Sequence, residues 1–79
     1  MQNANVVALD MKPNWGKAPR WADYFAVDLS GVGRWYEAAP KKSLAGYWYA
    51  ETPNRQMSRL AGIGFDSTSW RNSLEERPE

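Results

Sequence analysis

The sequence predicts a small, mainly β domain, with an α+β arrangement as the alternative within this fold class. In the middle of the chain, most aromatic and β-branched residues fall in segments where apolar and polar residues alternate as in a β-strand. Turns that contain glycine or proline separate these segments. The chain has 79 residues, which corresponds to one domain. We therefore expect a three- to four-stranded antiparallel meander, followed by a short C-terminal helical turn.

The central hairpin is predicted over residues 24–29 and 32–38, with its turn at Ser30-Gly31. Glycine reaches positive φ without steric cost, so this dipeptide is the best turn in the chain. A turn centred there pairs Val27 with Arg34. The same register gathers the expected core on one face: Phe25, Val27, Leu29, Val32 and Tyr36. A shift of one residue would exchange the two faces, so the core assignment depends on this turn.

Two further segments follow the hairpin. Residues 47–51 alternate as a strand, and we expect them to be the third strand of the meander after a loop over 40–46. Residues 57–65 form either a fourth strand or a packed irregular segment, and the sequence leaves both open. Residues 66–74 begin with N-cap residue types and predict one or two helical turns that dock Trp70 and Leu74.

The ends of the chain are expected to cover the sheet. Residues 1–5 and 75–79 are predicted to fray, and residues 6–9 form either an edge strand or an anchor on the core. The loop over 12–19 contains Trp15, which is too large to leave in water without a reason. We favour Trp15 as a lid over the sheet, with a ligand-stacking tryptophan as the alternative.

The composition argues against several kinds of site. The chain has no histidine and no cysteine, which removes the usual general base, disulfides and the usual zinc ligands. Its acidic residues are scattered, so no hard-cation site is expected. We therefore predict no enzymatic activity, no metal and no cofactor. The sequence lacks a signal-peptide run or a membrane span, so a cytoplasmic protein is expected.

One pattern points to binding, because basic residues are interleaved with aromatic ones. Such residues can form a stacking surface for single-stranded nucleic acid, or a protein-binding hot spot. They can also be the core of a very small protein, which is the simpler interpretation. The formal net charge of +1 disfavours nucleic acid. The candidate binding residues are Arg34, Trp35, Lys41, Lys42 and Trp48.

Two motifs resemble those of small phage and prophage accessory proteins. Residues 15–22 read W-G-K-A-P-R-W-A and match a W-x-x-A-P-x-W-A pattern, which Ala26-Val27-Asp28 and Trp35-Tyr36-Glu37 continue. Residues 70–78 read W-R-N-S-L-E-E-R-P and match the W-R-x-S-L-x-x-R-P close of the same group. The resemblance spans residues 15–78, apart from the loop before the third strand and the segment 57–65. It implies a bacterial host cell and carries over no catalytic residues.

The leading hypothesis is a non-enzymatic phage-encoded protein that binds a host bacterial protein, for host modulation or anti-defence. Small phage proteins often redirect a host protein, which is an argument by analogy. The alternatives are a single-stranded nucleic-acid-binding β domain and a minor virion or assembly component. No membrane contact is expected, and the sequence does not define the oligomeric state.

Overall fold

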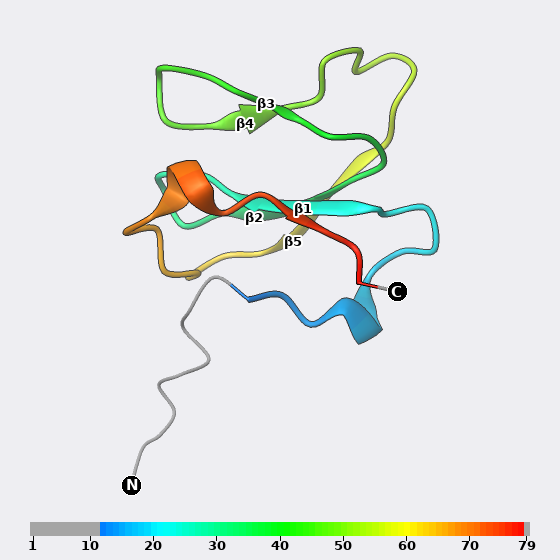
Figure 1. Cartoon of the computed structure of the whole chain (residues 1–79), viewed down its shortest axis with the longest axis horizontal. Helices are drawn as coiled ribbons and strands as arrows, with labels where there is room; N and C mark the ends of the chain where they lie inside the picture. The colour runs from blue at the N-terminus through cyan, green and yellow to red at the C-terminus, as the bar shows by residue number, and fades with distance from the viewer. Residues whose placement is uncertain (1–11, 79) are drawn as a thin grey trace, which may run out of the picture.

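The computed structural model describes residues 12–78, so the predictions for residues 1–5 and 6–9 lie outside the described part. The predicted mainly β antiparallel fold is confirmed (Figure 1). The only helical elements within residues 12–78 are two short 3₁₀ turns, at Trp15–Lys17 (η2) and Trp70–Asn72 (η3). The strands are Tyr24–Val27 (β1), Gly33–Tyr36 (β2), Lys41–Lys42 (β3), Trp48–Tyr49 (β4), Ser58–Gly62 (β5) and Glu75–Glu76 (β6).

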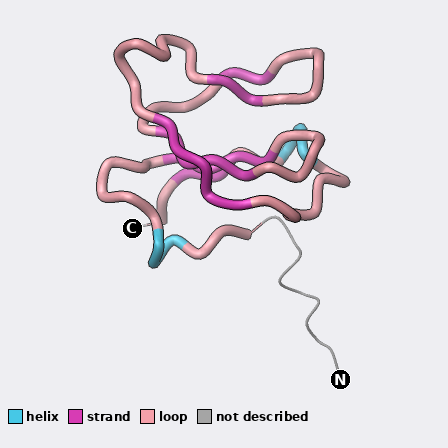
Figure 2. Tube along the Cα trace, turned by 180° about the vertical axis from the view of Figure 1, so that it is seen from behind, coloured by secondary structure: helices cyan, strands magenta, loops and turns pink. Residues whose placement is uncertain are grey.

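The strands form two separate groups, which are visible as two sets of magenta segments in Figure 2. One is a four-stranded sheet in the order β5-β2-β1-β6, and the other is a two-stranded ribbon of β3 and β4. The open question about residues 57–65 is thus answered, because β5 pairs with β2. The prediction that residues 47–51 form the third strand of the meander is wrong, since β4 pairs with β3 instead.

The central hairpin is present, but its predicted register is wrong by one residue. Val27 pairs with Gly33 and not with Arg34. The connection is a three-residue loop, in which the Gly31 amide donates to the Asp28 carbonyl (2.9 Å) and Gly31 has φ +88°. A type I turn followed by a residue in the left-handed region has this geometry. Glycine therefore takes the positive φ expected of it, one position later in the turn.

This register divides the expected core between the two faces of the sheet. One face buries Ala22, Phe25, Val27 and Trp35, against which Trp15, Ala18, Trp21, Ala61 and Phe65 pack. The other face buries Ala26, Tyr36, Trp48 and Trp70. Figure 1 shows the β3–β4 ribbon on one side of the sheet and η2 on the other. Both faces of the sheet are thus covered, and the ribbon, which was not expected, forms much of one cover.

The N-terminal loop closes the first of these faces, which confirms the prediction for Trp15. Its ring centroid lies 4.9 Å from that of Trp35, and its Nε1 donates to the Glu75 carboxylate (2.9 Å). Arg77 donates from Nε to the Ala22 carbonyl (2.8 Å) and stands 5.4 Å from the Trp15 ring. The two ends of the described chain are thus held together by direct contacts.

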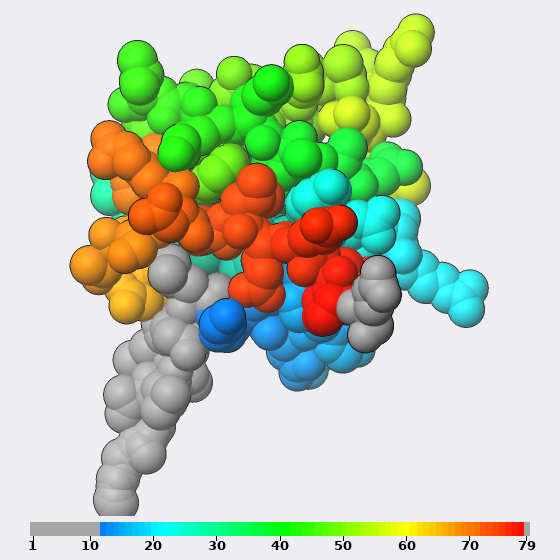
Figure 3. All heavy atoms as spheres, in the orientation of Figure 1, coloured from blue at the N-terminus to red at the C-terminus, as the bar shows by residue number. Residues whose placement is uncertain are grey.

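The C-terminal segment is ordered by pairing, so the prediction that residues 75–79 fray is wrong for residues 75–78. Glu75–Glu76 pair with β1 as β6, and the Arg77 amide donates to the Asp23 carbonyl (2.7 Å). The expected helical turn is confirmed as η3, which buries Trp70. Leu74 remains 38% exposed and does not dock as predicted. In Figure 3 this segment, coloured orange to red, runs between the ribbon and the N-terminal segment.

Candidate binding groove

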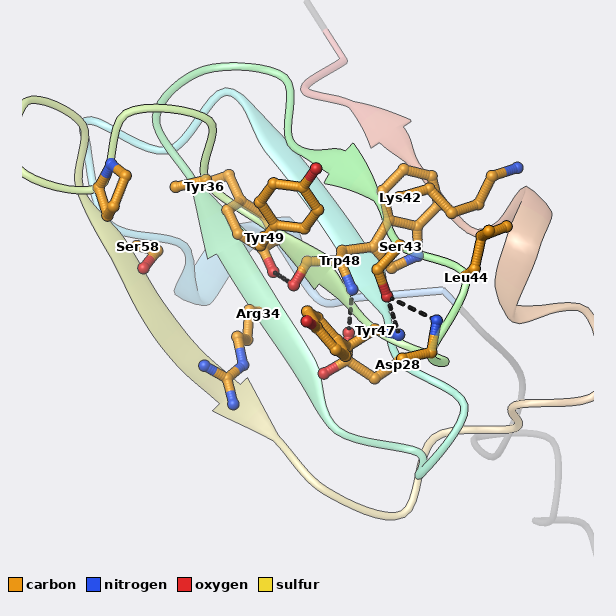
Figure 4. A pocket seen from close by; sticks show the side chains of 13 residues that line it. Asp28, Arg34, Tyr36, Lys42, Ser43, Leu44, Tyr47, Trp48, Tyr49 and Ser58 are labelled. Carbon is orange, nitrogen blue, oxygen red and sulfur yellow. Dashed lines mark hydrogen bonds between the residues drawn. The ribbon is translucent and has the colours of Figure 1, made fainter.

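An open groove lies between the β3–β4 ribbon and the face of the four-stranded sheet (Figure 4). Its volume is about 950 Å³. The ribbon forms one wall and β2, with the first residue of β5, forms the other. The lining residues are Asp28, Arg34, Tyr36, Lys42, Ser43, Leu44, Ala45, Tyr47, Trp48, Tyr49, Ala50, Pro53 and Ser58.

The ribbon is fixed to the sheet by hydrogen bonds to Trp48. The Trp48 amide donates to the Asp28 carboxylate (2.8 Å), and the Tyr36 hydroxyl donates to the Trp48 carbonyl (3.2 Å). The indole Nε1 of Trp48 donates to the Trp70 carbonyl (3.1 Å). These bonds satisfy both backbone groups and the indole of a buried residue, which would be costly to leave unpaired. The wall of the groove is therefore held in a defined position.

Tyr36 forms part of the groove floor as a neutral hydrogen-bond donor. Burial and, secondarily, the negative charge of Asp28 raise the pKa of Tyr36 to about 12, while Arg34 opposes the shift. A phenol with such a pKa stays protonated at neutral pH. Its role is to hold the ribbon, and it does not provide an acid or base near pH 7.

Two tyrosines project from the ribbon into the groove instead of packing in a core. Tyr47 is 47% exposed and Tyr49 44%, and their ring centroids lie 6.1 Å apart with the rings edge to face. Leu44 at the tip of the ribbon is 99% exposed. Figure 4 shows both tyrosine rings on the ribbon side of the opening, with Arg34 and Ser58 on the sheet side. Exposed tyrosines beside an arginine are the side-chain types that contribute most to binding hot spots.

The basic residues differ in how far they are already engaged. Arg34 is exposed, and its guanidinium makes no ion pair within the part of the chain that the structure describes. Lys42 donates from Nζ to the Arg71 carbonyl (3.2 Å) and lies 5.7 Å from the Trp48 ring centroid. Lys41 makes an exposed ion pair with Glu51 at 3.9 Å, of the kind that contributes little stability. Of these three candidate residues, Arg34 is thus the cation most available to a ligand.

The structure brings together three of the five predicted binding residues. Arg34, Lys42 and Trp48 line the groove, whereas Lys41 does not, although it lies next to Lys42 on β3. Trp35 is only 5% exposed and packs in the core on the opposite face of the sheet. Trp48 is also buried, at 7% exposed, so it can offer only a small part of its surface.

The five candidate binding residues did not include Tyr47, Tyr49 or Leu44, although both tyrosines belong to the pattern of interleaved aromatic and basic residues. The pattern that identifies the tyrosines was present, because they alternate with Trp48 and must share one face of a strand. Which of the two faces is buried follows from the pairing of β4 with β3, and the sequence alone did not predict that pairing.

Other kinds of site find no support in the described residues. Within residues 12–78, no three acidic side chains gather as metal ligands. In the same part of the chain, no helix has the length and apolar character needed to cross a membrane. No protein-family model matches the sequence, and no curated protein or solved structure matches it either. The geometry of the groove is therefore the basis for a functional assignment.

Proposed function

We propose that this chain is a non-enzymatic binding protein that uses the groove to hold a protein of a bacterial host, in the host cytoplasm. The observation that carries the proposal is the pair of exposed tyrosines facing Arg34 across an open groove. In a domain whose other aromatic residues mostly pack inward, two adjacent exposed aromatic rings form a patch of the kind that marks an interaction site. The absence of histidine and cysteine from the sequence supports a role in binding and not in catalysis.

The phage origin and the bacterial host enter from the two sequence motifs described above. Protein is preferred over nucleic acid because the net charge of +1 provides little general attraction for a polyanion. The groove is lined by one arginine, one lysine, one aspartate and three tyrosines, and its other lining residues are uncharged, which suits a protein surface with a few acidic or polar groups. Host modulation or anti-defence is the biological role that this binding would serve.

The test is affinity capture from bacterial lysate with the wild-type protein and two matched variants, each with and without nuclease. Tyr49→Ala combined with Arg34→Glu alters the groove, whereas Arg20→Glu makes the same charge change at an exposed position outside it. We expect a discrete host protein to be retained after nuclease, and the groove variant to recover about tenfold less of it. The control variant should recover as much as the wild type.

Other outcomes distinguish the alternatives. Capture that disappears with nuclease, and affinity that falls steeply with salt, would support the single-stranded nucleic-acid hypothesis. Recovery of the protein alone in every arm would favour a virion or assembly component. Equal capture by the wild type and the groove variant, with both folded, would show that the groove is not the binding site.

A further inference from the structure

The outer edge of β5 presents free backbone groups. β5 is the outermost strand of the four-stranded sheet, and within residues 12–78 only β2 pairs with it. The Glu37 amide donates to the Met57 carbonyl (3.0 Å), so the backbone groups of Met57 point toward β2. Successive residues of an antiparallel strand direct their backbone groups to alternate sides. The amides and carbonyls of Ser58 and Leu60 therefore point away from β2, toward solvent.

Apolar side chains lie along the same edge. Met57 is 50% exposed, Leu60 57% and Ile63 77%. Proteins usually protect such edges with charges, prolines or bulges. Here the irregularity in the β2–β5 ladder lies near Gly62, and Arg59 is turned over the ring of Trp21 at 5.8 Å. The stretch from Ser58 to Leu60 is left available for a further strand.

The charge along this edge is positive. Arg59 is the only charged residue of β5, Arg55 precedes the strand, and Arg34 pairs with Leu60 on the neighbouring strand. The nearby Glu37 carboxylate already accepts the Met57 amide (2.9 Å). A second copy of this chain would bring another basic edge, whereas an acidic segment would complement the charge.

From these observations we propose that the β5 edge binds an extended segment of a partner protein by strand addition. The segment would alternate acidic residues with β-branched apolar residues. Its backbone would pair with Ser58 and Leu60 and its apolar side chains would cover Leu60. Its carboxylates, on the opposite face of the added strand, would meet Arg59. The edge adjoins the groove at Ser58, but the strand would use outward backbone groups of β5, which the function assigned to the groove does not involve.

The test uses a short synthetic peptide that alternates glutamate and valine, with both ends blocked, and a control peptide with lysine in place of glutamate. Amide chemical shifts and hydrogen exchange are followed by NMR on the full chain. We expect the acidic peptide to shift the amides of Ser58 and Leu60 and to slow their exchange. The lysine peptide should bind about tenfold more weakly because of like-charge repulsion.

Two variants separate strand addition from other binding. Leu60→Pro removes the outward amide donor while leaving the β2 ladder bonds in place, and should weaken the acidic peptide about tenfold. Leu60→Glu leaves the backbone amide in place and repels the acidic peptide. It therefore replaces Leu60→Pro as the test variant if the proline variant does not fold. A variant with Tyr47→Ala and Tyr49→Ala alters the groove alone and should bind the peptide as the wild type does.

Three results would overturn the proposal. The first is the absence of shifts at Ser58 and Leu60 at high peptide concentration. The second is unchanged peptide affinity in a folded Leu60 variant. The third is slow exchange of both amides without peptide, because the edge would then already be covered by another part of the chain or by a second copy.

Discussion

Replacing Ser73 by alanine tests how the C-terminal segment is attached to the sheet. The Ser73 hydroxyl accepts from the Val27 amide (2.8 Å) and lies 2.8 Å from the Trp70 carbonyl, to which it can donate its single proton. Ser73 is 5% exposed and Val27 is fully buried. Alanine leaves the Val27 amide without a partner in a site that excludes water. We expect the free energy of unfolding to fall by about 2 kcal/mol, within the usual 1–3 kcal/mol for an orphaned buried group.

The measurement is urea unfolding followed by tryptophan fluorescence. For a domain of this size, a loss of about 2 kcal/mol corresponds to roughly 8–16 °C in the melting temperature. Ser69→Ala is the matched control, because Ser69 is exposed and its side chain makes no capping hydrogen bond; its effect should stay within about 0.5 kcal/mol. If Ser73→Ala and Ser69→Ala unfold at the same urea concentration with the same slope, the hydroxyl does not hold the segment as we argue.

Two further predictions concern the interior of the sheet. Gly33→Ala places a Cβ 2.7 Å from a ring carbon of Phe65 and should lower the free energy of unfolding, measured in urea, by about 1–3 kcal/mol. Gly62→Ala, whose Cβ has its nearest contact at 3.4 Å, should lower it clearly less. Equal losses in the two variants would contradict the packing argument. The pKa of Tyr36 is raised from 10.0 to about 12 in the folded state, so its contribution to stability is complete below pH 10 and is lost as the pH rises through 12. Unfolding measured across this range should show a loss of at most about 3 kcal/mol from this group, and Tyr36→Phe should lack that loss; an identical alkaline profile in the variant would refute the assignment.

The position of the central turn could be predicted from the sequence, but its length could not. Gly31 can supply a positive φ in either a two-residue or a three-residue loop, so the glycine alone does not choose between them. Contacts from distant parts of the chain favour the longer loop. The Leu29 amide donates to the Gly46 carbonyl (2.8 Å), and the Phe65 amide donates to the Gly31 carbonyl (3.0 Å). These partners lie far along the sequence, so the register of the hairpin, and with it the core, depends on tertiary structure.

The same limit explains why the third strand was assigned to the wrong segment. Residues 47–51 carry the stronger β pattern, yet they turn back on residues 41–42 to form the ribbon. The Ser43 amide donates to the Tyr47 carbonyl (2.9 Å), and Gly46 has φ +101°, as a tight hairpin requires. The ribbon then leaves the edge of β2 free for β5. This change of strand partners decides which side chains are exposed at the groove. The sequence did not predict the change, so it did not identify these residues as candidates.

Four residues of the two sequence motifs, Trp15, Pro19, Ala22 and Arg77, take part in contacts between the two ends of the described chain. Arg77 reaches the carbonyls of Ala22 and Pro19, and Glu75 accepts from the Trp15 indole. Variants at these positions should therefore change the free energy of unfolding and leave the groove and the β5 edge as they are. Variants at the exposed groove and edge positions should do the reverse, because those side chains contribute little to either core. A binding measurement is thus informative about function at exposed groove and edge positions, whereas a loss of binding on changing one of the residues that join the two ends would first have to be corrected for the fraction unfolded.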